Sequence, residues 1–157
     1  MATVAAPGVA TESGHDAYEV LLSRCHALEP VVTAVAYPCE QTALTGVVEA
    51  AEARLIAPIL VGPRQAICQV AGEAGLNIDP YPIEDVPDAR AAAAKAVELI
   101  RSARAEALMK GSLHTDELMS AVVSSATGLR TGRRISHAFV MSVPTYPKPL
   151  IVTDAAI

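Results

Sequence analysis

The chain has 157 residues, of which 52% are hydrophobic, so it is long enough and apolar enough to bury a core. Aromatic residues make up only 3%, which leaves Ala, Val, Ile and Leu to build that core and favours helices packed on a buried sheet. A formal net charge of -5 argues against a general nucleic-acid binder, so an anionic ligand would need a local basic site.

Cysteine usage and the first residues indicate the compartment. The three cysteines, Cys25, Cys39 and Cys68, have no C-x-x-C spacing, which predicts neither a disulfide framework nor a zinc site. A reduced, cytoplasmic setting fits them best. Residues 1–14 contain no lysine or arginine and predict a flexible tail, not a signal peptide. No apolar run approaches the roughly 20 residues of a membrane-spanning helix, so no membrane partner is expected.

The first half of the chain alternates helical and strand patterns. Residues 15–28 have the apolar spacing of a helix, and the β-branched residues 31–37 predict a buried strand. A second helix is expected at 42–54 and a second strand at 57–61. Pro63 then opens a third helix, because the missing proline N–H is not needed in a first helical turn.

The second half continues this alternation. Residues 83–86 predict a short, polar strand near a sheet edge. A long helix over 89–104 follows, with Asp88 as its N-cap. A further strand at 106–110 leads through a glycine turn into a helix at 115–124.

Two strands are expected at the end of the chain, at 137–143 and 150–153, on either side of the proline-rich residues 144–149. They are close enough in sequence to pair antiparallel. Strands that alternate with helices imply a mainly parallel sheet with right-handed crossovers. The sequence therefore predicts one three-layer α/β/α domain over residues 15–157, with a terminal antiparallel strand pair.

Ligands of such sheets bind outside the carboxyl ends of the strands. Four features are expected at those ends: residues 38–40, 62–64 and 110–112, and Asp154. Asp154 could be a carboxylate of a ligand site, or it could equally cap a helix.

The turn after strand 106–110 is the candidate anion site. Five residues share it: Lys110, Gly111, Ser112, His114 and Thr115. Backbone N–H groups, the positive end of a helix dipole, a lysine and two hydroxyls meet there, which suits a phosphate-bearing ligand. The alternative is an ordinary helix start, in which the histidine is a cap or a surface residue. Asp116 and Glu117 favour the dipole but repel an incoming anion.

A second basic group lies in a glycine-flanked loop. Arg130, Arg133 and Arg134 supply three of the twelve Lys and Arg residues within five positions. Arginine forks match phosphate geometry, although a solvated loop is the alternative. Ser136 and His137 are not expected to form a nucleophile pair, because adjacent strand residues point to opposite faces.

Other common catalytic signatures are absent. Cys39 has no Lys or Arg near it in sequence to lower its pKa, so we interpret it as structural. The sequence contains no Walker A motif, G-x-S-x-G elbow, G-x-G-x-x-G fingerprint or zinc signature. Kinase, serine hydrolase and dinucleotide oxidoreductase functions are therefore disfavoured, and no metal is expected.

Three separated motifs carry a resemblance to a known family. ALMKGSLHTDELMSAV at 107–122, GLRTGRRISHAFVM at 128–141 and TDAAI at 153–157 resemble, in this order, the phosphate acetyltransferase/phosphate butyryltransferase family. The likeness runs from about residue 22 to residue 157. It is strongest to the transferase part of bifunctional proteins that also carry a MaoC-like enoyl-CoA hydratase module. The fold implied is one half of an isocitrate/isopropylmalate dehydrogenase-like domain.

The resemblance implies acyl exchange between acyl phosphate and coenzyme A, by attack of the thiol on the acyl carbonyl and departure of phosphate. CoA is then a substrate and not a permanent cofactor, and no metal takes part in bond making. The turn at 110–115 and the arginine loop, with Ser136 and Asp154, would contribute to the phosphate and CoA sites. A homodimer or larger oligomer in the cytoplasm is expected.

The chain also departs from the family. Members are longer, and the half that follows TDAAI supplies the base and the groups that hold the CoA thiol. We therefore expect an N-terminal fragment that is inactive alone. The helix after the His-Thr pair reads LMSA where acetyltransferases often have arginine, a pattern closer to the butyryl type.

Two other functions stay open. One is a non-catalytic CoA- or phosphate-binding or assembly module of the same fold. The other is an unrelated α/β enzyme close to the isocitrate dehydrogenases, against which the absence of a metal-carboxylate set argues.

Overall fold

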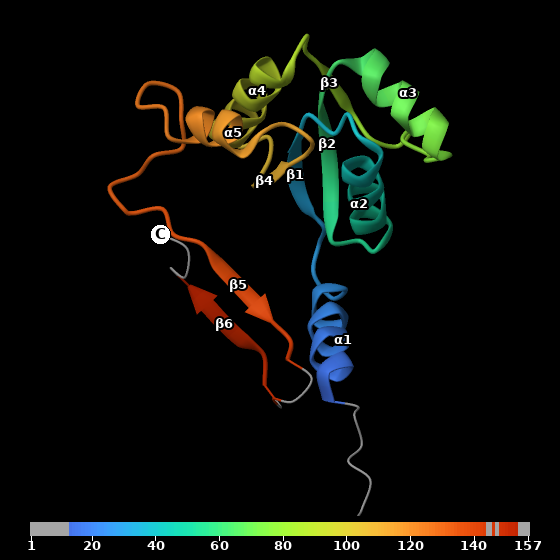
Figure 1. Ribbon diagram of the computed structural model, residues 1–157, viewed down its shortest axis with the longest axis vertical. Helices are drawn as coiled ribbons and strands as arrows, with labels where there is room; N and C mark the ends of the chain where they lie inside the picture. The colour runs from blue at the N-terminus through green and yellow to red at the C-terminus, as the bar shows by residue number, and fades with distance from the viewer. Residues whose placement is uncertain (1–12, 144–145, 147, 154–157) are drawn as a thin grey trace, which may run out of the picture. The chain divides into compact units, whose positions relative to one another are not determined.

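The structure is a computed structural model that describes residues 13–143, 146 and 148–153 (Figure 1). Two compact units can be separated: Glu29–Arg133, and Met1–Leu28 together with Arg134–Ile157. Each unit is described by itself below. The single domain expected over residues 15–157 stays a prediction.

The larger unit is built on a parallel sheet of four strands in the order β3-β2-β1-β4. The strands are β1 (Val31–Ala36), β2 (Ile56–Gly62), β3 (Ile83–Asp85) and β4 (Ala107–Lys110). Every pairing in this sheet is parallel, and β3 lies at an edge, as its short and polar sequence predicted.

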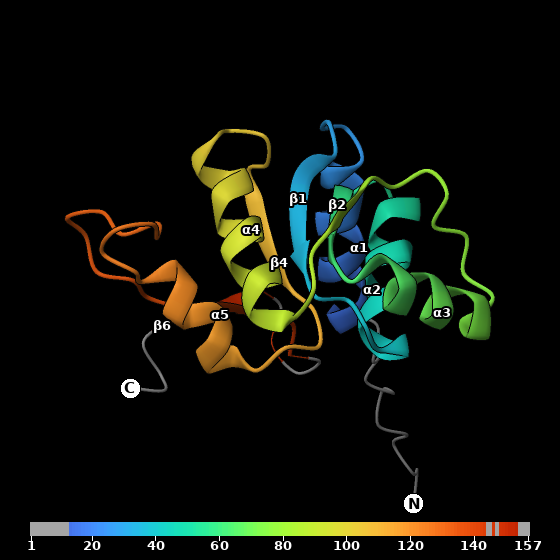
Figure 2. The same ribbon diagram turned by 90° about the horizontal axis from the view of Figure 1, so that it is seen from above.

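Helices cover both faces of this sheet (Figure 2). The helices are α2 (Gln41–Glu52), α3 (Arg64–Ala74), α4 (Ala89–Arg101) and α5 (Thr115–Val122). Helices α2 and α3 pack on one face, and α4 and α5 on the other. The predicted three-layer α/β/α fold with a mainly parallel sheet is confirmed.

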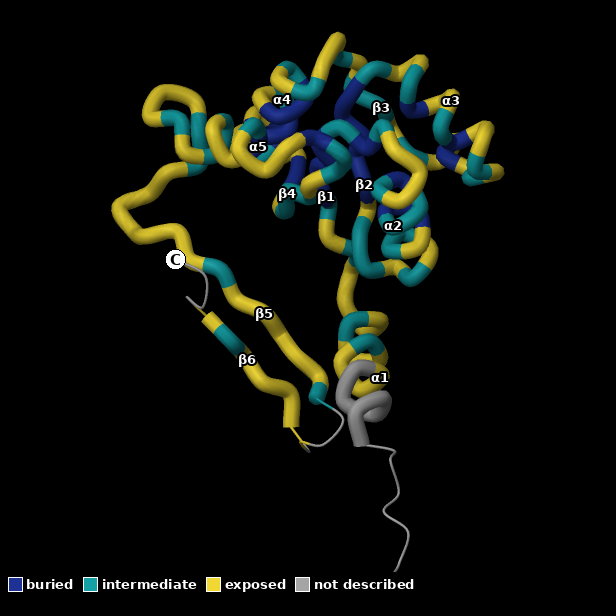
Figure 3. Tube along the Cα trace, viewed as in Figure 1, coloured by how far each residue is buried: buried dark blue, intermediate teal, exposed yellow. Residues whose placement is uncertain are grey.

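The two apolar layers follow from the alternation of side chains along β1 and β2. Val35 and Leu60 face α2 and α3 and are completely buried there. Ala34 and Val61 belong to the opposite layer with four buried residues of α4: Ala92, Ala93, Ala96 and Leu99. Alanine side chains let the axis of α4 come close to the sheet, and the burial is visible in the dark blue trace of this unit (Figure 3).

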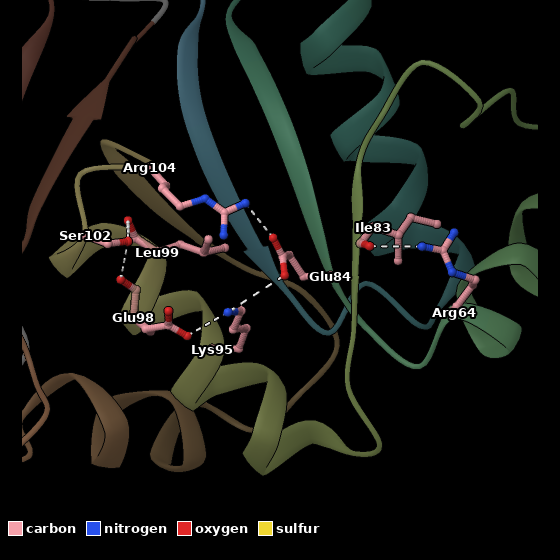
Figure 4. Close-up of polar contacts among 8 residues, drawn as sticks. All are labelled: Arg64, Ile83, Glu84, Lys95, Glu98, Leu99, Ser102 and Arg104. Carbon is pink, nitrogen blue, oxygen red and sulfur yellow. Dashed lines mark hydrogen bonds and ion pairs between the residues drawn. The ribbon is translucent and has the colours of Figure 1, made fainter.

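Polar contacts join the edge strand β3 to its neighbours (Figure 4). The guanidinium of Arg104 donates to Glu84 Oε1 at 2.6 Å, and Lys95 Nζ lies 3.8 Å from Glu84 Oε2. On the other side, the guanidinium of Arg64 donates to the carbonyl oxygen of Ile83 at 3.0 Å. These contacts compensate for the short backbone ladder of β3.

The smaller unit contains helix α1 (Ser13–Cys25) and the strands β5 (Ala138–Met141) and β6 (Leu150–Thr153). The two strands form an antiparallel pair of their own, which confirms the predicted pairing. All four residues of β5 are exposed, as the yellow trace shows (Figure 3).

Several element boundaries differ from the predicted ones. The first helix begins at Ser13, inside the expected tail, and ends at Cys25 instead of residue 28. Its end is set by a turn in which the Leu28 N–H donates to the Cys25 carbonyl at 2.9 Å. Strand β5 is shorter than the predicted 137–143, because only Ala138–Met141 pair with β6.

Candidate functional site

The order of the strands determines where a ligand site is expected. Strand β1 lies between β2 and β4, and the chain leaves β1 toward α2 on one face and β4 toward α5 on the other. In open α/β sheets, ligands bind at the carboxyl ends of strands where the connections diverge in this way. We call this place the β1–β4 junction, and define it as residues 37–40 and 110–115.

Gly111 brings the two halves of the junction into contact. Its N–H donates to the Ala36 carbonyl at 2.8 Å, which continues the β1–β4 ladder past the end of β4. A Cβ at this position would lie 2.5 Å from the carbonyl oxygens of both Ala36 and Tyr37. Glycine is therefore required here by the close approach of two backbones.

Ser112 ties the β4 turn to the exit of β1. Its hydroxyl donates to the Tyr37 carbonyl at 2.7 Å and accepts the Cys39 N–H at 3.1 Å. The Ser112 N–H also donates to the Tyr37 carbonyl, at 2.9 Å. Sequence analysis placed Ser112 at the turn but did not foresee its partners, which lie 73 and 75 residues away.

Lys110 supplies positive charge at the junction. Its side chain is exposed, and Nζ donates only to the Gly111 carbonyl, at 3.3 Å. Among the ion pairs of the residues that the structure describes, none involves Lys110. Its ammonium is therefore available to a ligand anion.

His114 and Thr115 are exposed at the start of α5. The His114 N–H donates to Glu117 Oε2 at 3.1 Å, so a carboxylate of this helix already holds one amide of the helix start. Asp116 adds a second carboxylate in the first turn. An anion bound here would meet these charges, which reduces what the dipole of α5 can contribute.

The N-termini of α3 and α4 are also occupied by carboxylates. Asp85, at the end of β3, accepts the Arg64 N–H at 2.9 Å, and Asp88 accepts the Ala91 N–H at 2.7 Å. Segment 62–64, expected at the binding edge, is therefore a capped helix start and not an open one.

Helix α2 differs from these helices, because its N-cap residue Glu40 makes no side-chain cap bond and its first turn holds no acidic residue. It begins directly after the β1 exit, and no side chain of the described residues caps its first N–H groups, although the Glu40 carboxylate adds negative charge there. Sequence analysis missed this contribution. The signal was present as the lack of Ser, Thr, Asp or Asn at the N-cap position.

Cys39 is protonated at neutral pH. Burial, and then the charge of Glu40, raise the pKa of its thiol to about 11. Its side chain packs against the apolar residues between the sheet and α2. A raised thiol pKa and this packing agree with the interpretation of Cys39 as a structural residue, which stays a prediction.

Of the other predicted site residues, Arg130 and Arg133 lie in the larger unit, and no interaction among its described residues joins them to the junction. Arg130 and Arg133 are exposed, and the Arg133 N–H donates to Thr131 Oγ1 at 3.2 Å in a local turn. Arg134 and Ser136 are exposed residues of the smaller unit. Asp154 lies outside the described residues.

A hollow of about 610 Å³ lies between α4 and α5 and includes no residue of the junction. Two arginines, Arg90 and Arg101, line it together with two carboxylates, Glu98 and Glu117. The opposite charges balance, so the hollow is not an evident anion site.

Within the part of the chain that the structure describes, no group of three His, Cys, Asp or Glu could hold a metal, and no helix could span a bilayer.

Comparison with known proteins shows which proteins the chain resembles. No protein-family model matches the chain. It is 58% identical over 140 residues to a phosphate acetyltransferase of Rhizobium meliloti, covering 89% of this chain and 44% of that protein. It is 51% identical over 137 residues to a phosphate acetyltransferase of Rickettsia felis, covering 87% and 39%. A phosphate butyryltransferase of Clostridium beijerinckii is 35% identical over 139 residues, covering 88% and 46%.

The chain thus spans less than half the length of these curated relatives, of which two are named acetyltransferases and one a butyryltransferase. The resemblance that the three motifs carried is confirmed. Over the residues aligned, the chain is similar to phosphate acetyltransferases and phosphate butyryltransferases.

Proposed function

We propose that this chain contributes part of an acyltransferase site that moves an acyl group between acyl phosphate and coenzyme A. The observation that carries the proposal is the 58% identity over 140 residues to a phosphate acetyltransferase. In the reaction, the CoA sulfur bonds to the acyl carbon, the bond from that carbon to the phosphate oxygen breaks, and the thiol proton leaves to a base. The proposed acyl group is acetyl or butyryl, because relatives of both names align with the chain.

The β1–β4 junction supports the binding half of this chemistry. Lys110 offers an ammonium that forms no ion pair with any described residue, and the start of α2 offers backbone N–H donors. Fixed backbone donors together with a positive charge can hold an anionic phosphate in position without a metal. His114, Thr115 and the turn around Gly111 complete the phosphate side of the proposed site.

The arginine loop and the residues after it are proposed for the CoA phosphates. This group consists of Arg130, Arg133, Arg134, Ser136 and Asp154. The three arginines are matched to phosphate by their fork geometry. The base and the groups that hold the thiol are proposed to lie in the part of the relatives that this chain does not cover.

The chain alone is therefore expected to be inactive as a transferase. A coupled assay would follow acetyl- or butyryl-phosphate-dependent acylation of CoA, with a full-length relative as the reference. Turnover near that of the relative would overturn the expectation of an inactive fragment. We also propose a cytoplasmic location and a homodimer or larger oligomer, which sizing can test.

A second candidate is a non-catalytic CoA- or phosphate-binding or assembly module. It is favoured by the observation that the chain spans less than half of its relatives. Isothermal titration with CoA, acetyl phosphate and inorganic phosphate separates the candidates, because binding without turnover is the signature of the module.

The titration also tests the site. Lys110→Gln should weaken phosphate binding, whereas Lys148→Gln removes the same charge from an exposed position outside the junction and should not. Equal losses of phosphate affinity in both variants would show that the junction does not bind the phosphate.

A further inference from the structure

The Ser112 hydroxyl is committed to the backbone of the β1 exit. It has one proton, and that proton goes to the Tyr37 carbonyl at 2.7 Å. One of its lone pairs accepts the Cys39 N–H at 3.1 Å. The hydroxyl therefore has no donor left for a phosphate oxygen, which an anion-binding serine would need.

The backbone that Ser112 holds is in an uncommon conformation. Tyr37 has φ of 57°, in the left-handed region that a residue with a Cβ enters only at an energetic cost. Such residues persist only where their surroundings hold them, and they gather at functional sites. Four hydrogen bonds hold Tyr37: its carbonyl accepts the hydroxyl and the N–H of Ser112 and also the Cys39 N–H, at 2.9 Å, and its own N–H donates to the Val61 carbonyl at 2.7 Å.

The position of α2 depends on this conformation. The left-handed turn at Tyr37 leads through the buried Pro38 to Cys39, whose N–H is bound by Ser112. Helix α2 begins at Gln41, two residues later. The hydroxyl of Ser112 thus links the turn that follows Lys110 to the start of α2.

We propose that Ser112 is a positioning residue that sets the start of α2 relative to Lys110, and that it is not a ligand contact. This inference rests on the proposed function and replaces the direct phosphate contact expected for Ser112 from the sequence. The effect of Ser112 on binding is indirect. Without the hydroxyl, Tyr37 can leave the left-handed region, and the N–H donors at the start of α2 then move away from the bound anion.

The test uses four variants of the whole chain. Ser112→Ala and Ser112→Val remove the hydroxyl, Ser112→Thr keeps it, and Ser102→Ala removes a hydroxyl that bonds the Glu98 carbonyl away from the junction. NMR scalar couplings report φ at Tyr37, titration with inorganic phosphate and with CoA reports affinity, and thermal unfolding reports stability. Because one hydrogen bond is lost, we expect the affinity of the Ala and Val variants to be weaker by about fivefold to tenfold.

The expected pattern is that both hydroxyl-free variants shift φ at Tyr37 and bind more weakly, while the Thr and Ser102→Ala variants match the wild type. Weaker binding with φ unchanged would overturn the inference, because the hydroxyl would then contact the ligand. Unchanged binding with φ shifted would overturn it as well. A wild-type chain that binds neither probe would refute the proposed site instead, and φ at Tyr37 would still decide whether Ser112 holds the turn.

Discussion

At position 111, the space left by two backbones admits no side chain. The nearest atoms that a Cβ would meet are carbonyl oxygens at the end of β1, which cannot swing aside as a flexible side chain can. The turn is therefore sensitive to the smallest substitution, although it lies at the surface edge of the sheet.

Gly111→Ala should lower the free energy of unfolding by about 1–3 kcal/mol, as overpacking of a close contact does. The matched control is Gly46→Ala within α2, where a Cβ meets nothing within 4 Å. That variant should be neutral or more stable, by up to about 1 kcal/mol, since alanine favours helix. Urea titration measures both, and a Gly111→Ala variant as stable as Gly46→Ala would contradict the close approach.

The raised pKa of Cys39 has a chemical consequence. Because the thiolate is the reactive form, a pKa of about 11 leaves Cys39 almost entirely protonated at neutral pH. Maleimide should label the exposed Cys68 first, and the labelling of Cys39 should accelerate only as the solution becomes strongly alkaline. Mass spectrometry of peptides measures each site.

Glu40→Gln provides the control for this prediction. It removes the charge that contributes after burial to the raised pKa, so labelling of Cys39 should become moderately faster. Rapid neutral labelling of Cys39 in the wild type would show that the thiol is neither buried nor protonated as described.

At the scale of elements, the carboxylates that cap the helix starts lie at different sequence distances from the N–H groups that they accept. Asp88 caps its own helix, and Glu117 reaches back three residues to His114. Asp85 instead caps α3 from the end of β3, 21 residues from its partner Arg64. The last contact joins a helix to a strand and so stabilises the edge of the sheet.

Asp85→Ala should destabilise the chain by about 1 kcal/mol, the usual effect of losing a helix cap. Asp79→Ala is the control, because Asp79 is exposed and only its backbone N–H takes part in a bond, with Asn77. Thermal unfolding of the two variants compares them directly. The interpretation fails if both variants unfold at the same temperature as the wild type.

At the scale of the whole molecule, the β5–β6 pair leaves apolar side chains in solvent. Val140 and Ile151 are register partners and are 61% and 71% exposed. Isolated two-stranded sheets have little stability in water, and exposed apolar patches mark interaction surfaces.

We therefore expect self-association through this strand pair. Val140→Lys and Ile151→Lys should shift the chain toward monomer and reduce the binding of an apolar dye, as measured by analytical ultracentrifugation and fluorescence. Val123→Lys, at an exposed apolar position of the larger unit, is the control. A wild-type chain that is monomeric at all concentrations and binds no dye would contradict the expectation.

Much of the fold was predictable because its signals are local. The continuous β-branched run of β1 and the alanine spacing of α4 at intervals of three and four are local patterns that need no distant partner. The turn at Gly111 was also recognisable from its composition. The partners of Ser112, the cap on α3 and the uncapped start of α2 were not, since they depend on which strands become neighbours.

The sequence by itself determined the class of fold, the alternation of elements, the candidate turn and the family, because each is written in local spacing or in residue identity. Only the tertiary structure decided the role of each group in that turn. By placing β4 beside β1, it used the Ser112 hydroxyl internally and set the start of α2 beside the turn. Among the described residues, it also left the Lys110 ammonium without an ion pair. The physical reason is that the Ser112 hydroxyl donates its one proton to a carbonyl more than 70 residues away, and local sequence does not reveal that this donor is already used.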